Sequence, residues 1–123
     1  MKKSGLIALV LILGQVFAAG AAMAETMSWK FRSQHPNIVD VQLYAPARNL
    51  VWPANGQVWS LKDYASHNVA INCTRGDKIC YGAWVRGSES SYWGAGRLNK
   101  HSCTSCCYTC GATQETPVIN LNR

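Results

Sequence analysis

The stretch Val39-Asp-Val-Gln-Leu-Tyr44 alternates apolar and polar side chains. Successive side chains of an extended chain point to opposite faces, so its valines and leucine share one face while Asp40 and Gln42 share the other. This period of two residues is typical of an antiparallel strand with one face on a core and one face in water. The stretch therefore predicts a half-buried antiparallel β-strand.

Further short segments with strand composition lie between turn residues. They occur at 29–32, 58–61, 69–73, 79–85, 91–93 and 118–121. No long helical period appears after residue 24, and the one helical candidate is a turn near Ser60, where a strand is equally consistent. Several short strands at this spacing predict an all-β fold, a small antiparallel β-sandwich or barrel-like domain stapled by disulfides.

The N-terminal segment has the three parts of a secretory signal peptide. Two lysines follow the first methionine, the next segment is apolar, and Ala22-Met-Ala24 has the small residues that precede a cleavage site. We expect cleavage after Ala24, which makes residues 1–24 a signal peptide and residues 25–123 a single β-rich, disulfide-containing domain. The alternative is an uncleaved membrane anchor, which the glycines in this segment disfavour. After removal of the leader we expect no membrane span.

The expected cleavage places the domain outside the cytoplasm. A short basic start and a small-residue site are typical of bacterial export, so we expect a periplasmic or secreted protein in a compartment where disulfides persist. The formal net charge is +6, and the two lysines of the leader are part of it. The other lysines and arginines are spread along the chain, which disfavours nucleic acid as a partner. The mild positive charge fits attraction to anionic envelope polymers.

Six cysteines are available for disulfides. They are Cys73, Cys80, Cys103, Cys106, Cys107 and Cys110. The first two flank a turn at Arg75-Gly-Asp77, which predicts a hairpin between two strands. If these strands pair, the two cysteines are only diagonal neighbours, so a direct bridge requires a bulge or a longer loop. The alternative is that one or both reach the C-terminal cysteines, and the sequence does not select among the pairings.

The other four cysteines form the cluster Cys103-Thr-Ser-Cys-Cys-Tyr-Thr-Cys110, which has three interpretations. A thiolate metal site, with His101 nearby, usually separates its two ligand pairs by roughly a dozen residues, whereas these pairs abut. A redox-active dithiol usually lies at a helix N-terminus in a βαβ unit, which is not indicated here. Structural disulfides fit an oxidising compartment. We therefore predict that all six cysteines are oxidised, with at least one bridge inside 103–110, and we expect no metal or other cofactor.

The cysteine cluster, the stretch Gly76-Asp-Lys-Ile-Cys-Tyr-Gly-Ala-Trp84 and the closing Thr116-Pro-Val-Ile-Asn-Leu121 together carry a resemblance. They resemble a group of small exported bacterial proteins of undetermined function. The resemblance covers roughly the C-terminal half of the chain. It implies an exported domain, and it brings no catalytic residues to carry over.

Residues 81–97 interleave large aromatic rings with glycine, serine and charged residues. Flat rings with a polar edge form platforms for sugars, and arginine or glutamate side chains fix hydroxyls or carboxylates. The candidate ligand-binding residues are Trp84, Arg86, Glu89, Tyr92, Trp93 and Arg97. Alternation along 79–85 places Tyr81 on the apolar face and Trp84 on the opposite face, where it is either exposed or covered by a loop. The tryptophans at 29, 52 and 59 are expected to be core or loop anchors.

No catalytic motif is present in the chain. A catalytic triad can be drawn from His67, Asp63 and Ser66. Their closeness in sequence favours a solvated turn instead. P-loop, nucleotide-binding glycine and H-E-x-x-H patterns are absent from the sequence. We therefore expect a non-catalytic exported binding or envelope-associated module, with a glycan or an anionic envelope polymer as partner. The alternatives are a thiol-based binder of zinc or copper that uses the cysteine cluster, and a small secreted enzyme.

The leader generates a first testable prediction. The exported protein should begin at Glu25, because the small-residue site ends at Ala24. Its intact mass should equal that of residues 25–123, less two hydrogens for each disulfide. Mass spectrometry of exported material checks this, and recovery of a chain that still carries the leader would contradict it.

Overall fold

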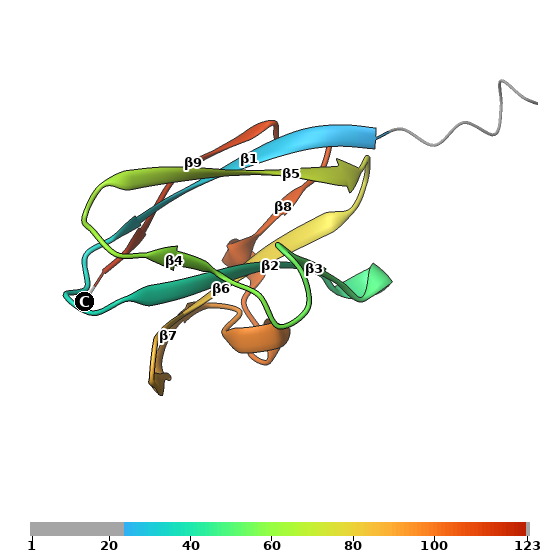
Figure 1. Cartoon of the computed structure of the whole chain (residues 1–123). Helices are drawn as coiled ribbons and strands as arrows, with labels where there is room; N and C mark the ends of the chain where they lie inside the picture. The colour runs from blue at the N-terminus through green and yellow to red at the C-terminus, as the bar shows by residue number, and fades with distance from the viewer. Residues whose placement is uncertain (1–23, 123) are drawn as a thin grey trace, which may run out of the picture.

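Strands occupy most of residues 24–122, the part of the chain that the computed structural model describes (Figure 1). They are β1 (Ala24–Ser33), β2 (Val39–Ala45), β3 (Leu50–Trp52), β4 (Trp59–Leu61), β5 (Ser66–Thr74), β6 (Lys78–Val85), β7 (Ser88–Gly94), β8 (Cys107–Thr109) and β9 (Glu115–Leu121). Three single 3₁₀ turns, η1 (Pro46–Arg48), η2 (Arg97–Asn99) and η3 (Thr104–Cys106), lie between them. The predicted all-β class is confirmed. The segment expected to be a signal peptide lies outside the described residues, apart from Ala24, which begins β1.

The strands form two sheets that face each other (Figure 1). The first sheet, the upper layer in the figure, has the order β5-β1-β9. The second sheet is built on β2 and β6, with β3 and β4 paired to β2 along one edge and β7 and β8 paired to β6 along the other. The pairings are antiparallel except that of β1 with β9, which is parallel. Two strands share each edge of this sheet. Strand β2 pairs first with β4 and then with β3, and β6 pairs first with β8 and then with β7.

The core lies between the sheets and is centred on β1. Alternate residues Met27, Trp29 and Phe31 are buried, and the rings of Trp29 and Phe31 stack with centroids 6.0 Å apart. They pack with the inward-facing side of β2, which carries Val41 and Leu43. Full burial of each such side chain contributes about 1.5–3 kcal/mol. This cluster is the main apolar contribution to the stability of the fold.

The predicted turn at 75–77 is present, but the predicted hairpin is wrong. The Asp77 N–H donates to the Thr74 carbonyl at 3.0 Å, yet β5 pairs with β1 and β6 pairs with β2, so the chain passes from one sheet to the other at this turn. The chain after β8 takes the place of the expected partner. The Gly76 N–H donates to the Cys110 carbonyl at 2.9 Å, and the Cys110 N–H donates to the Asp77 carbonyl at 2.8 Å.

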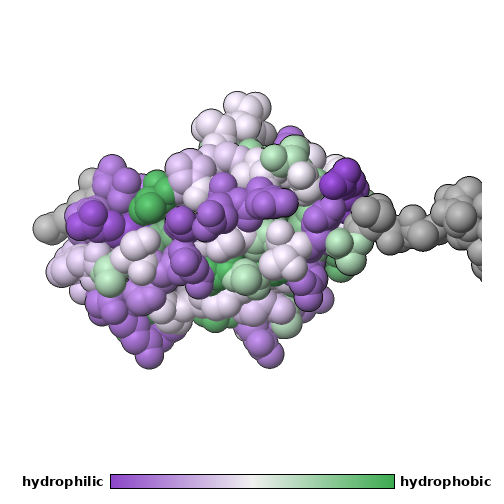
Figure 2. Space-filling model, turned by 90° about the horizontal axis from the view of Figure 1, so that it is seen from above, coloured by the Kyte–Doolittle hydropathy of each residue, from purple (hydrophilic) through white to green (hydrophobic). Residues whose placement is uncertain are grey.

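Strand β2 is not half-buried, because its second face is covered as well. All its residues are buried, including Asp40 and Gln42. The segment that follows β7 lies against this outer face of the second sheet, and a Cβ added at Gly82 would overlap the carbonyl of Gly96. The outer face of the first sheet is different. Figure 2 shows it as mainly hydrophilic, with small separate apolar areas.

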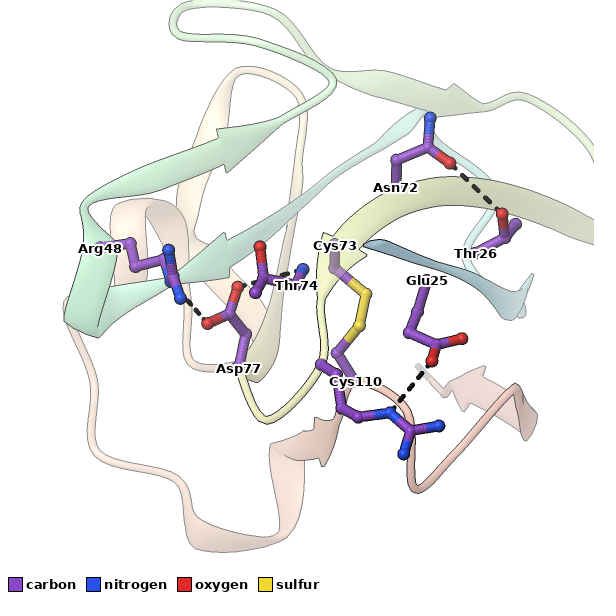
Figure 3. Close-up of a disulfide and its surroundings, with 9 residues drawn as sticks. Glu25, Thr26, Arg48, Asn72, Cys73, Thr74, Asp77 and Cys110 are labelled. Atoms are coloured by element: carbon purple, nitrogen blue, oxygen red, sulfur yellow. Dashed lines mark hydrogen bonds and ion pairs between the residues drawn. A yellow bond between two sulfur atoms is a disulfide. The ribbon is translucent and has the colours of Figure 1, made fainter. Parts of the chain in front are cut away.

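Three disulfides connect the six cysteines. Cys73–Cys110 joins β5 of the first sheet to the chain just after β8 of the second, between the Glu25–Arg75 and Arg48–Asp77 ion pairs (Figure 3). Cys80–Cys107 joins residues that are direct partners in β6 and β8. Cys103–Cys106 closes the short turn η3. The predicted bridge inside 103–110 is confirmed, and both cysteines of the turn at 75–77 reach C-terminal partners.

The bridges should contribute unequally to stability. The sequence separation is 37 residues for Cys73–Cys110 and 3 for Cys103–Cys106, and the entropy removed from the unfolded chain grows with loop length. Replacing Cys73 and Cys110 together by alanine should cost about 3–4 kcal/mol. Replacing Cys103 and Cys106 together should cost clearly less. Urea unfolding of the two double variants measures both changes. Equal losses of unfolding free energy would contradict a dependence on loop length.

Candidate binding site

The outer face of the second sheet is covered by residues 95–101, here named the cover loop. Its two ends are fixed to each other and to β6, because the Ala95 N–H donates to the Tyr81 carbonyl at 2.8 Å and the Ala95 carbonyl accepts from the His101 N–H at 2.9 Å. Gly96 between them has a φ of 75°, where glycine is favoured, and a Cβ there would overlap the His101 ring. The local sequence Gly94-Ala-Gly96 therefore suits a loop that lies directly on the sheet.

The Tyr44 hydroxyl holds the middle of the cover loop. It accepts a hydrogen bond from the Leu98 N–H at 2.7 Å, and two acceptors lie within reach of its proton, Gln42 Oε1 at 2.8 Å and the Gly96 carbonyl at 3.2 Å. Leu98 has a φ of 53°, an unfavourable conformation for a bulky side chain. Burial raises the pKa of Tyr44 to about 12, against the smaller opposite effects of the Leu98 hydrogen bond and the Arg97 charge.

A pocket of about 410 Å³, here named the outer pocket, opens beside the cover loop. It is lined by Asp40, Val58, Trp84, Arg86, Gly87 and Arg97. Trp84 is only 6% exposed, so its ring is part of the wall and not a free platform. The Arg97 guanidinium carbon lies 5.7 Å from the centroid of that ring, within the range of a cation–π interaction.

A buried carboxylate orients the second arginine of the outer pocket. Arg86 donates from Nε to Asp40 Oδ2 at 3.1 Å and from Nη2 to Asp40 Oδ1 at 2.8 Å. Ser60 Oγ lies 2.6 Å from Nη2 and donates to Asp40 Oδ1 at 3.0 Å. The hydrogen bond to Asp40, followed by its charge, raises the pKa of Arg86. Because the Arg86 side chain is 49% exposed, its guanidinium is fixed at one end and reaches the solvent.

The structure brings together three of the six candidate residues, Trp84, Arg86 and Arg97, in the outer pocket. Tyr92 pairs with Trp84 in the sheet and so lies on the same face, 42% exposed, with its ring stacked on His101 at 4.0 Å. Trp93 lies on the other face, where it packs against the core and donates from Nε1 to the Asn122 carbonyl at 2.7 Å. Trp84 and Trp93 therefore do not form one platform. The Glu89 side chain lies outside what the structure describes.

Three residues at this face were missed by the sequence analysis. The alternation in β2 placed Asp40 in water, whereas it is buried and bonded to Arg86 and Ser60. The sequence indicates Ser60 only as a turn residue and His101 only as a neighbour of the cysteine cluster, because each comes next to the site only in the folded chain. The signal available in the sequence was Gly94-Ala-Gly96, whose small residues permit close packing of the loop.

The triad drawn from Asp63, Ser66 and His67 is not formed. His67 Nε2 lies 2.6 Å from Asp63 Oδ1 in an exposed turn, and this hydrogen bond lowers the pKa of Asp63. Ser66 and His67 are neighbours in β5, so their side chains point to opposite faces. The pair is an exposed hydrogen bond between the turn before β5 and the start of β5.

All cysteines of the chain are in disulfides, so the cluster holds no thiolate for a metal. Among the described residues, no group of three or more histidine, cysteine or acidic side chains is arranged to hold a metal ion. Over residues 24–122 no helix has the length and hydropathy needed to span a bilayer. Comparison with protein-family models, with curated proteins and with solved structures gives no match.

Tyr44→Phe should test the attachment of the cover loop. Loss of the hydroxyl leaves the Leu98 N–H and Gln42 Oε1 without this partner, which should cost about 1–3 kcal/mol. The native state also keeps the Tyr44 proton to about pH 12, whereas the unfolded chain releases it near the ordinary tyrosine pKa of 10.0. Stability should therefore be independent of this group below pH 10 and fall from pH 10 to about 12.

Urea unfolding at several pH values measures both effects. The difference between wild type and Tyr44→Phe should shrink as the pH rises through this window. Tyr64→Phe is the matched control, because the Tyr64 ring is exposed. A Tyr44→Phe protein as stable as the control variant would show that the hydroxyl does not hold the loop.

Proposed function

We propose that this domain is an exported binding module and that the outer pocket takes an acidic group of a glycan or of another anionic envelope polymer. The observation that carries the proposal is the pair of arginines, Arg86 and Arg97, on the wall of one pocket that also contains the Trp84 ring. The pocket volume of about 410 Å³ is within the usual range for small-ligand sites.

The chemistry of the pocket favours a carboxylate or phosphate group on the ligand. Guanidinium groups bind such groups through paired N–H donors, and an arginine fixed in advance loses less side-chain entropy on binding. The Asp40 carboxylate fixes Arg86 through Nε and Nη2, which leaves Nη1 outside that pairing. Arg97 lies over the indole and contributes a second positive charge to the same wall.

The exposed ring of Tyr92 adds an apolar surface on the same face. It lies beside Trp84 in the sheet, and the His101 ring stacks on one of its two faces. Rings of this kind pack against the apolar side of sugar units. A polymer with alternating apolar sugar faces and acidic groups therefore fits this face better than a neutral or purely ionic ligand. The disulfides and the expected leader are compatible with a location outside the cytoplasm.

Binding of a polyuronic acid tests the proposal. Alginate should bind the processed protein, with an affinity that falls as salt is added, whereas neutral dextran should bind at least about tenfold more weakly. Arg97→Gln and Tyr92→Ala should each weaken alginate binding while the melting temperature stays near that of wild type, because both side chains are exposed. Isothermal calorimetry with melting curves of each variant gives both readings.

The matched control is Arg32→Gln, which removes one exposed arginine from the first sheet. Equal losses for Arg32→Gln and Arg97→Gln would mean that only net charge matters and would reject the outer pocket. Arg86→Ala is unsuitable as the main variant, because it leaves Asp40 buried without its cation and destabilises the fold. Trp84→Ala is unsuitable for a similar reason, since it removes a buried ring.

A further inference from the structure

A second pocket of about 410 Å³ takes part of its wall from the end of the cover loop and lies against two disulfides. It is here named the cysteine pocket. Its wall includes Lys78 at the start of β6, Lys100 and His101 at the end of the cover loop, and Cys103. None of the residues that line it is acidic. The pocket is therefore a basic surface with disulfide-bonded cysteines in its wall.

The Cys103–Cys106 bridge is open to reagents on one side only. Cys103 lines the pocket and is partly exposed, whereas Cys106 is only 4% exposed and does not line it. The residues around the bridge, Ser102, Thr104 and Ser105, are exposed. Because a thiolate attacks the disulfide sulfur that it can reach, Cys103 is the sulfur open to attack from the pocket.

Opening this bridge leaves the rest of the fold in place. Cys103 and Cys106 are separated by 3 residues, so the bridge closes only a short loop. The neighbouring Cys80–Cys107 bridge also reaches the pocket, but it joins direct partners of β6 and β8, and Cys80 is buried. Both of the other bridges connect distant parts of the chain, with separations of 27 and 37 residues.

We propose that Cys103 is an exchange site for anionic low-molecular-weight thiols, which the cysteine pocket attracts through Lys78, Lys100 and His101. In the exchange, the thiolate of the small molecule attacks Cys103 Sγ and forms a mixed disulfide. The Cys103–Cys106 bond breaks, the electron pair goes to Cys106 Sγ, and that sulfur takes up a proton from water. The number of disulfides is unchanged, so no external oxidant or reductant is required.

The two lysines give the site its selectivity among thiols. Cationic groups raise the local concentration of an anionic reagent and stabilise its thiolate. A thiol with carboxylates, such as glutathione, should therefore react faster than a neutral thiol of similar size. A preference for the anionic thiol distinguishes attraction by the pocket from the general reactivity of an exposed disulfide.

A trapping variant makes the mixed disulfide measurable. In Cys106→Ser the resolving sulfur is absent, so Cys103 should form a stable adduct when the processed protein is treated with glutathione disulfide. In Cys103→Ser the remaining Cys106 is buried and should form no adduct on the same timescale. Intact mass and peptide mapping locate the adduct. A cooperative unfolding transition in a melting curve shows that each variant is folded.

The rate of adduct formation tests the role of charge. In the Cys106→Ser background, glutathione disulfide should react about tenfold faster than the neutral hydroxyethyl disulfide, and this ratio should fall towards one at high salt. Lys100→Gln and Lys78→Gln should each reduce the ratio, whereas Lys62→Gln, an exposed lysine outside the pocket, should not. Equal rates for the two disulfides, an adduct on Cys106, or labelling of Cys80 or Cys107 would overturn the proposal.

Discussion

The Tyr44 hydroxyl holds the cover loop on the outer face of the second sheet and so determines whether that face is covered. Without a partner on that face, β2 and β6 would present Asp40, Gln42 and Trp84 to water. The hydroxyl accepts from the Leu98 N–H and lies within reach of the Gly96 carbonyl, so the cover loop is held on the sheet. Both pockets take part of their wall from that loop. The site geometry therefore depends on one buried polar contact between segments far apart in the chain.

The two sheets differ in how their outer faces are covered. The first sheet buries one face and exposes a mainly hydrophilic one (Figure 2). In the second sheet, β2 is buried on both faces and β6 along most of its length, so the outward-facing polar groups of β2 must find partners inside the protein. Asp40 finds Arg86 and Ser60, and Gln42 donates to the Gln57 carbonyl at 2.7 Å. A fixed guanidinium at the pocket wall is a consequence of satisfying a buried carboxylate.

The three disulfides differ in how much they contribute to the stability of the fold. Cys73–Cys110 links the two sheets and Cys80–Cys107 fixes β8 on β6, so both hold elements that the core alone would hold less firmly in a domain of this size. Cys103–Cys106 links only neighbours in a turn, and removing it changes little in the unfolded chain. The bridge that should matter least for stability also has one cysteine, Cys103, in the wall of a basic pocket.

The sequence by itself determined the all-β class, the positions of most strands and the presence of a bridge within the cysteine cluster, because alternation, turn residues and cysteine spacing are local properties. It also placed Trp84 opposite Tyr81 in β6. Only the tertiary structure decided the rest. The partners of Cys73 and Cys80, the burial of Asp40 and the packing of Trp93 against the core all depend on which distant segment lies on a given face. Local pattern specifies that a side chain points outward, but it does not specify whether water or another segment meets it there.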